Sequence, residues 1–175
     1  MPLNEEVVLV DEQDRPTGVM EKLEAHRRGL LHRAFSVFVL NSEGRVLLQR
    51  RALGKYHSGG LWTNACCSHP RPGEDLRDAA ERRLREELGL HCTLVHRFHF
   101  TYHAAVGGGL YEHEFDHVFL GRSDGPLHPD PAEVMDIRWA LPAEIDADLA
   151  ERPEQCTAWF RICWPRMRGS LASPA

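Results

Sequence analysis

The chain has 175 residues, of which 42% are apolar and 27% charged, and its formal net charge is −5. This composition fits one globular domain with a full core, and the negative charge argues against a nucleic-acid partner, which needs a basic protein surface. No stretch approaches the ~20 apolar residues that cross a bilayer, and residues 1–6 do not resemble a secretory signal. We therefore expect a single domain over residues 1–175, located in the cytoplasm, with no membrane or nucleic-acid partner.

The first third of the chain predicts strands, a turn and a short helix. Three runs rich in β-forming residues predict strands: residues 7–10, 34–40 and 46–49. A turn-rich stretch covers residues 11–18, and residues 21–28 fit a short helix. Asn41-Ser42-Glu43-Gly44 is typical of a hairpin turn, and residues 53–60 are expected to form a loop.

A strong helix is predicted next. Asp75 is a suitable N-cap, and Gly89 stands where a helix that ends at Leu88 would place its left-handed C′ residue. Four apolar residues recur at every fourth position and form one buried stripe: Leu76, Ala80, Leu84 and Leu88.

The last part of the chain returns to strands and ends in helices. Strands are expected at residues 97–103, 110–120 and 134–140, and three successive glycines, at 107–109, connect the first two. Residues 142–150 and 153–168 predict two helices. Strands on both sides of one central helix indicate an α+β protein with a mixed β-sheet core flanked by α-helices.

The five cysteines are Cys66, Cys67, Cys92, Cys156 and Cys163. An odd number without a secretory signal indicates reduced thiols in the cytosol. No two of them form a CxxC pair, which argues against a structural zinc ribbon.

Charged residues on the central helix match the Nudix box, G-x5-E-x7-R-E-U-x-E-E-x-G-U, where U is aliphatic. A solvated face with ion pairs is the simpler interpretation of such a helix, but seven positions match at fixed spacing: Glu74, Arg82, Leu84, Glu86, Glu87, Gly89 and Leu90. Ser68 replaces the first glycine and Arg83 replaces a glutamate. Carboxylates suit Mg²⁺, whereas a guanidinium binds phosphate and cannot be a general base at neutral pH. In the Nudix family this box coordinates a divalent metal against a diphosphate, so the resemblance implies that diphosphate binding is kept and that Arg83 weakens water activation.

Cys67 and His69 directly precede this helix. A cysteine is more often a packed apolar residue than a catalytic one, and a single histidine is more often structural than a ligand. Alternation along an extended segment would nevertheless direct Cys67 and His69 to one side, with Cys66 facing the core. His26 and His32 are weaker candidates by themselves.

An acidic stretch over residues 111–116 is a further candidate. In a strand, Glu112, Glu114 and Asp116 would share one face, which is either wet or in contact with a cation. Imidazole and carboxylate ligands together suit Mn²⁺, Zn²⁺ or Fe²⁺, and carboxylates alone suit Mg²⁺. His113 and His117 would point to the opposite face and are not expected to be ligands.

Motifs along nearly the whole chain, from Val7 to Trp159, resemble those of the type 1 isopentenyl-diphosphate isomerases, which have the Nudix fold. The motifs that carry the resemblance, besides the modified Nudix helix, are Glu21-Lys22 with His26, Leu31-His32-Arg33-Ala34-Phe35-Ser36, Gln49-Arg50-Arg51, Leu61-Trp62-Thr63-Asn64, Cys67-Ser68-His69-Pro70 and Tyr111-Glu112-His113-Glu114. The resemblance implies a reversible conversion of isopentenyl diphosphate into dimethylallyl diphosphate, by protonation at one carbon and deprotonation at another.

The resemblance also implies a role for each matching residue. Cys67 and Glu114 would transfer protons on opposite faces of the alkene, with Tyr102 nearby. One Mn²⁺ or Zn²⁺ ion would be held by His26, His32, His69, Glu112 and Glu114. Glu87 and the backbone carbonyl of Cys67 would hold Mg²⁺. The phosphates would be bound by Lys22, Arg51, Lys55, Ser68 and Arg83.

Trp159 would cover the hydrocarbon end of the substrate. Protonation of an alkene creates a tertiary carbocation, which an indole face can stabilise if water is excluded. This chain has Ala158 where family members commonly have proline, and the resemblance is weakest after Leu141, so Trp164 is an alternative to Trp159.

Two other functions remain open on the sequence. One is a Nudix hydrolase that cleaves a nucleoside diphosphate derivative, against which Arg83 and the Cys67–His69 pair argue. The other is a catalytically silent module that senses a phosphorylated ligand, for which a thiol opposite a carboxylate has no use. The oligomeric state and the metal used in the cell are not indicated by the sequence.

Overall fold

A computed structural model describes residues 5–172. Within this range no helix is long and apolar enough to cross a membrane. We expect no secretory signal in residues 1–6. Of these, residues 1–4 lie outside the described residues.

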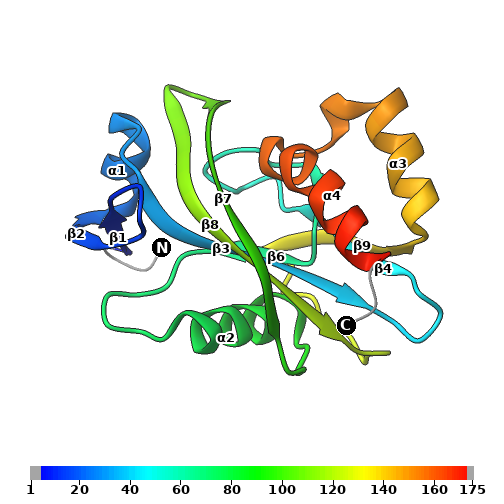
Figure 1. The fold of residues 1–175 in the computed structure, drawn as a ribbon. Helices are drawn as coiled ribbons and strands as arrows, with labels where there is room; N and C mark the ends of the chain where they lie inside the picture. Colours follow the sequence, from blue (N-terminus) through cyan, green and yellow to red (C-terminus); the bar gives the residue numbers. More distant parts are fainter. Residues whose placement is uncertain (1–4, 173–175) are drawn as a thin grey trace.

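The described chain forms one mixed sheet with helices on both sides (Figure 1). Its strands are β1 (Glu6–Val10), β2 (Pro16–Glu21), β3 (His32–Leu40), β4 (Val46–Arg51), β5 (Trp62–Thr63), β6 (Cys66–Ser68), β7 (Val95–Gly107), β8 (Leu110–Arg122) and β9 (Val134–Ala140). The helices are α1 (Lys22–Arg28), α2 (Leu76–Leu88), α3 (Pro142–Glu151), the 3-10 turn η1 (Pro153–Gln155) and α4 (Ala158–Leu171). The expected α+β class with a mixed sheet is confirmed.

Strand β3 occupies the centre of the sheet and sets the register of the functional residues. It pairs in parallel with β8, so that His32 lies opposite Glu114. On its other side it pairs antiparallel with β6, where Ser36 lies opposite Cys67. Strand β7 pairs antiparallel with β8 and places Tyr102 opposite Glu114. Residues distant in sequence therefore meet around one end of β3.

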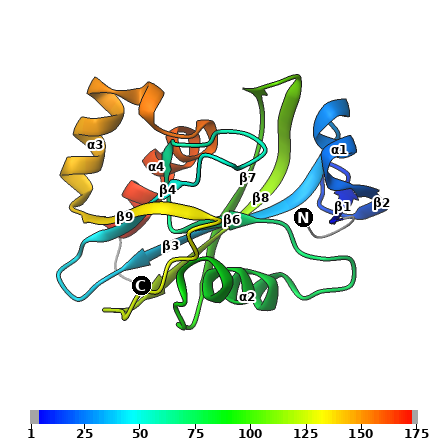
Figure 2. The same ribbon diagram turned by 180° about the vertical axis from the view of Figure 1, so that it is seen from behind.

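The two faces of the sheet are covered by different helices. Helix α2 packs on one face and α3 and α4 lie on the other, as Figures 1 and 2 show from opposite sides. Phe35, Val37 and Val39 of β3 join the α2 core, whereas Phe38 and Leu40 join the α4 core. Because alternate residues face opposite sides, the even-numbered residues of β3 and β8 share the α4 face.

Helix α2 forms for the reasons that its sequence indicates. The side chain of Asp75 accepts hydrogen bonds from the backbone N–H groups of Arg77 and Asp78, and Gly89 ends the helix at φ 63°. Of the predicted stripe, Ala80, Leu84 and Leu88 are fully buried and Leu76 is half-buried.

Two predicted elements differ from the structure. The helix expected over residues 153–168 is interrupted, because Thr157 N–H donates to the Trp62 carbonyl oxygen (3.0 Å) and Cys156 bridges to Trp62. This tie to β5 holds Cys156 extended and separates η1 from α4. The turn expected over residues 11–18 is shorter, because β2 already begins at Pro16 and pairs with β1.

Candidate active site

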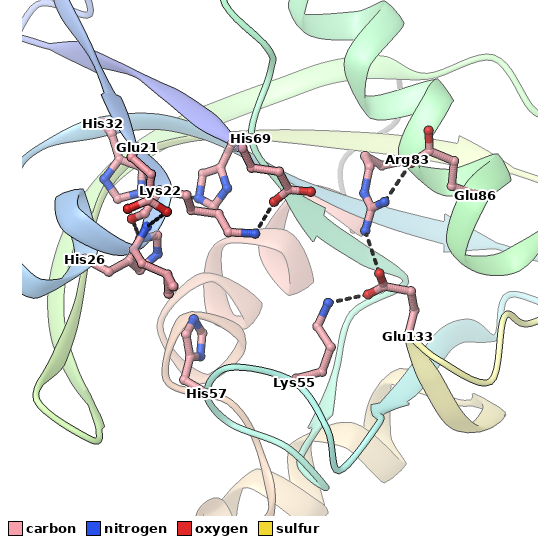
Figure 3. Close-up of polar contacts among 12 residues, drawn as sticks. Glu21, Lys22, His26, His32, Lys55, His57, His69, Arg83, Glu86 and Glu133 are labelled. Atoms are coloured by element: carbon pink, nitrogen blue, oxygen red, sulfur yellow. Dashed lines mark hydrogen bonds and ion pairs between the residues drawn. The ribbon is translucent and has the colours of Figure 1, made fainter. Parts of the chain in front are cut away.

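Three imidazoles and two carboxylates converge at one end of strands β3 and β8. Their ligand atoms all lie within 4.8 Å of one another, and they belong to His26, His32, His69, Glu112 and Glu114. Figure 3 shows the three histidines gathered on one side of the site. Helix α1 supplies the first of them, β3 the second and the segment after β6 the third, so this set depends on the long-range pairing around β3.

The ring orientation of two of these histidines prepares them to bind a metal. His26 Nδ1 lies 2.6 Å from the Lys22 carbonyl oxygen, and His32 Nδ1 lies 2.8 Å from that of Leu30. A carbonyl only accepts, so each Nδ1 carries a hydrogen, and Nε2 is the ring atom that faces the cluster. Burial lowers the pKa of His69 to about 3, which favours its neutral form. Burial opposes the charged form of His26 too, but its contact with the Glu112 carboxylate raises the pKa of His26.

The carboxylates of the cluster have no basic side chain to balance them. Glu112, Glu114 and Asp116 are 3%, 7% and 1% exposed, so the wet face that β8 alternation left open is wrong. Among residues 5–172 no Lys or Arg pairs with Glu112 or Glu114, and Glu112 Oε2 has no hydrogen-bond partner. Burial opposes the ionisation of Glu112, but the close Glu114, His26 and His57 side chains hold its pKa well below its usual range. Buried charge of this kind calls for a cation.

A small cavity joins this cluster to Cys67 and Trp159. Its walls also include Tyr102, whose hydroxyl donates to Glu114 Oε2 at 2.8 Å, and its volume is about 20 Å³. Burial, with the nearby Asp116 carboxyl, raises the pKa of the Cys67 thiol. Trp159 is 3% exposed and its Nε1 has no partner among the described residues. Cys66 packs in the α2 core, as the alternation predicted.

Trp164, the alternative to Trp159, does not reach this cavity. It is buried against Phe38 and Phe160, and its Nε1 donates to Asp146 Oδ1 at 2.7 Å. The geometry therefore favours Trp159 as the aromatic wall of the site.

Two residues of the site were missed in the sequence. Tyr56 and His57 come from the loop between β4 and β5 and line the same cavity. His57 Nε2 lies 2.5 Å from Glu112 Oε1, and its ring meets Trp159 edge-on with centroids 5.8 Å apart. The loop was expected, but no periodic pattern indicates which of its side chains turns inward.

The expected phosphate-binding residues lie around the cluster and differ in whether a carboxylate pairs with them. Arg51 is 8% exposed and lines the small cavity. Its Nη2 donates to the His57 carbonyl oxygen at 3.0 Å, and no carboxylate within residues 5–172 pairs with it. An adjoining hollow includes Lys22, Ser68 and Arg83 in its walls, and it meets the cavity at Ser68 and His69. Lys22 pairs with Glu5.

Arg83 and Lys55 lie in a network of ion pairs at α2 (Figure 3). Arg83 donates to Glu86 Oε2 and to Glu87 Oε1, both at 2.6 Å, and lies 3.5 Å from Glu133, which also pairs with Lys55. The other oxygen of Glu87 accepts from Gln49 Nε2 at 2.9 Å. Both oxygens of Glu87, an expected metal ligand, are therefore engaged.

Comparison with known proteins identifies the family. The NUDIX domain family matches residues 30–160. An isopentenyl-diphosphate Delta-isomerase 2 of Aromatoleum aromaticum is 52% identical over 165 residues, which cover 94% of this chain and 87% of that protein. The chain belongs to this isomerase family. The isopentenyl-diphosphate Delta-isomerase of Pectobacterium atrosepticum is also 52% identical, over 167 residues that cover 95% of this chain and 93% of that protein.

Solved structures support the Nudix fold of this isomerase family member. DR0079 from Deinococcus radiodurans superimposes with a TM-score of 0.78 at 22% identity and covers 93% of this chain and 98% of its own. A MutT protein from Methanosarcina mazei Go1 gives a TM-score of 0.68 at 18% identity, covering 82% of this chain and 96% of its own. At these identities the likeness concerns the fold alone.

Proposed function

We propose that this enzyme interconverts isopentenyl diphosphate and dimethylallyl diphosphate, and that Cys67 and Glu114 transfer the protons. The observation that carries the proposal is the cavity in which both side chains meet, together with Tyr102 and Trp159. Cys67 comes from β6 and Glu114 from β8, on the two sides of β3. Held groups of this kind replace two intermolecular proton transfers with positioned ones.

The surroundings of this cavity suit a carbocation. Protonation of the alkene creates a tertiary cation, and the Trp159 ring offers a buried π face that contributes about 2 kcal/mol when water is excluded. Tyr102 donates to Glu114 and so fixes one oxygen of this carboxylate. The other oxygen lies 3.0 Å from His69 Nε2.

The five-residue cluster fits a divalent metal, for which we propose Mn²⁺ or Zn²⁺. Mixed imidazole and carboxylate ligands suit these ions. Glu112 Oε2 has no hydrogen-bond partner among the described residues, and the Nε2 atoms of His26 and His32 face the cluster, so these atoms are available to a metal. A metal bound here would supply positive charge that holds Glu112 and Glu114 as carboxylates.

Glu87 and the Cys67 carbonyl oxygen are proposed to hold Mg²⁺ against the diphosphate. Because Glu87 Oε1 accepts from Arg83, this site requires Arg83 to leave that oxygen. A guanidinium forms charge-assisted, bidentate bonds with phosphate as well as with carboxylate, so a bound diphosphate would offer Arg83 a second partner and release Glu87.

Arg51 is the best-prepared phosphate ligand, because within residues 5–172 its buried guanidinium has no carboxylate partner and its Nε has no hydrogen-bond partner. Its other contacts are the His57 carbonyl oxygen and the Trp159 ring. Lys22, Ser68 and Arg83 line the adjoining hollow. Lys55 is connected to Arg83 through Glu133, with which both residues pair. These positions would hold the diphosphate in the hollow and direct the hydrocarbon toward Cys67.

The cavity must widen to take this substrate. A volume of about 20 Å³ holds roughly one water molecule, and a five-carbon chain is several times larger. Tyr56 and His57, on the loop between β4 and β5, are the wall residues whose movement would open it.

The chain is proposed to act as a single domain, in the cytoplasm, on a small-molecule diphosphate. The five cysteines are all free, which agrees with a reducing compartment. We propose no nucleic-acid or membrane partner.

Product analysis tests the proposal against its two rivals. Incubation with isopentenyl diphosphate should yield dimethylallyl diphosphate and no inorganic phosphate. Phosphate release would instead support a hydrolase, and binding without conversion would support a sensor. The absence of both products and binding would refute the proposed function.

A further inference from the structure

We propose that Asn64 is the positioning residue for the Cys67 thiol, assisted by Ser36. This inference rests on the proton-transfer role proposed for Cys67. It concerns two side chains that contact the sulfur, do not line the cavity, and are not used by the proposed reaction.

Two buried oxygens contact the sulfur. Cys67 Sγ lies 3.1 Å from Asn64 Oδ1 and 3.4 Å from Ser36 Oγ. Both neighbours are fully buried. Asn64 immediately follows β5 and Ser36 lies at the middle of β3, so the sulfur is approached from two different strands.

The orientation of the Asn64 amide is fixed by its other contacts. Its Nδ2 donates to the carbonyl oxygens of Val37 and Cys66, at 3.0 Å each. Because both partners only accept, the nitrogen must face them and Oδ1 must face Cys67. Asn64 therefore offers the thiol an acceptor in a position that the backbone of two strands determines.

Ser36 also presents an oxygen to the sulfur. Its hydroxyl donates to Asp116 Oδ2 at 2.7 Å, so its hydrogen is engaged away from Cys67. The Cys67 S–H therefore donates to Asn64 Oδ1, and Ser36 Oγ is a second oxygen at 3.4 Å from the sulfur. Since the Cys67 side chain has one torsion that moves its sulfur, these contacts fix where the sulfur stands when the alkene arrives.

A chain of hydroxyls extends the network to α4. Thr63 Oγ1 donates to Asn64 Oδ1 at 2.9 Å, and Thr157 Oγ1 donates to Thr63 Oγ1 at 3.0 Å. Thr157 directly precedes α4 and Trp159. This arrangement provides a matched control: Thr63→Val breaks the network one bond farther from the sulfur and leaves the contact between Cys67 and Asn64.

The test compares Asn64→Ala with Thr63→Val by two readouts. The first is the infrared S–H stretching band of Cys67, assigned by difference with Cys67→Ala. The second is the separate measurement of kcat and KM for isopentenyl diphosphate. Asn64→Ala should shift the S–H band toward that of a free thiol and lower kcat about 10²-fold with KM unchanged, since small misplacements of a reacting group cost about this much. Thr63→Val should leave the band and kcat close to the parent.

Equal losses of kcat in the two variants, or an unmoved S–H band in Asn64→Ala, would overturn the inference. Should Asn64→Ala fail to fold, Asn64→Ser keeps one donor for a backbone carbonyl but cannot reach the sulfur, and it must shift the band in the same direction. The band does not depend on turnover. A shifted band in a protein without isomerase activity would therefore refute the proposed function and leave the positioning of Cys67 intact.

Discussion

The histidine–carboxylate cluster and the Arg83 network hold their negative charge in opposite ways. In the first, Glu112 and Glu114 are buried beside three imidazoles, and no Lys or Arg within residues 5–172 pairs with either carboxylate. In the second, the carboxylates Glu86, Glu87 and Glu133 pair with the cations of Arg82, Arg83 and Lys55. The first region has a charge that an added cation would balance, whereas the second carries its own cations.

This difference indicates a division of labour. An uncompensated buried cluster is suited to a permanent metal that organises Glu114 for chemistry. A network of exchangeable ion pairs is suited to a diphosphate that enters and leaves, because Arg83 can move from carboxylate to phosphate. The hydrolytic glutamate of the Nudix box is absent at position 83, which agrees with a diphosphate that is bound and left intact.

The largest effect is expected at the proton-transfer pair. Cys67→Ala and Glu114→Gln should each abolish isomerisation, a loss of at least 10²–10⁴-fold, because each removes one of the two proposed proton carriers. Binding of isopentenyl diphosphate, measured by calorimetry, should survive in both. Turnover near that of the parent in either variant would contradict the mechanism, and Cys66→Ala, in the α2 core, is the matched thiol control.

Removal of the metal should have the next largest effect. Treatment with a chelator should reduce activity to background, and Mn²⁺ or Zn²⁺ should restore it. Metal that binds only the folded state should also stabilise the protein, by about 2.7 kcal/mol at a hundred times its dissociation constant.

The stability effect separates the cluster from adventitious sites. In His32→Ala the rise in unfolding temperature on metal addition should be lost or strongly reduced, because Nε2 of this ring faces the cluster. Indifference of the parent enzyme to chelator would show that the first region does not need an added cation.

A smaller effect is expected in the second region. Arg83→Glu should raise KM for isopentenyl diphosphate about 10- to 100-fold, since a charge-assisted hydrogen bond contributes about 1.5–3 kcal/mol and a carboxylate repels the phosphate. Arg85→Glu makes the same change of charge at an exposed position of α2 and is the control. If the two variants had equal KM values, Arg83 would not bind the diphosphate.

The smallest effect on rate is expected at the aromatic wall. Trp159→Leu should lower kcat about 30-fold, which corresponds to about 2 kcal/mol of lost cation–π stabilisation. Trp164→Leu should lower the unfolding temperature but leave kcat unchanged, because Trp164 lies in the core and bonds to Asp146. The reverse pattern would assign the hydrocarbon cover to Trp164.

Local patterns predicted those parts of the fold that depend on neighbours in sequence. Asp75, Gly89 and the apolar stripe defined α2 because capping and burial act within a few residues. The alternation of Cys66 and Cys67 correctly assigned them to different faces of the sheet. The break before α4 was missed, because it depends on the pairing of Cys156 and Thr157 with Trp62, more than ninety positions away.

The site was predicted unevenly for the same reason. The resemblance to the isomerase family implied the residues of the cluster, but the burial of Glu112, Glu114 and Asp116 follows from the pairing of β8 with β3 and β7, which a single strand does not reveal. Tyr56 and His57 were missed because a loop has no periodicity that fixes the direction of its side chains.

The most direct test of proton transfer to and from the substrate by Cys67 and Glu114 is incubation with isopentenyl diphosphate in D₂O, followed by NMR. The parent enzyme should form dimethylallyl diphosphate with deuterium in a methyl group and release no phosphate, and both Cys67→Ala and Glu114→Gln should form none. Dimethylallyl diphosphate that forms at the parent rate in either variant, or phosphate release in place of isomerisation, would contradict the account.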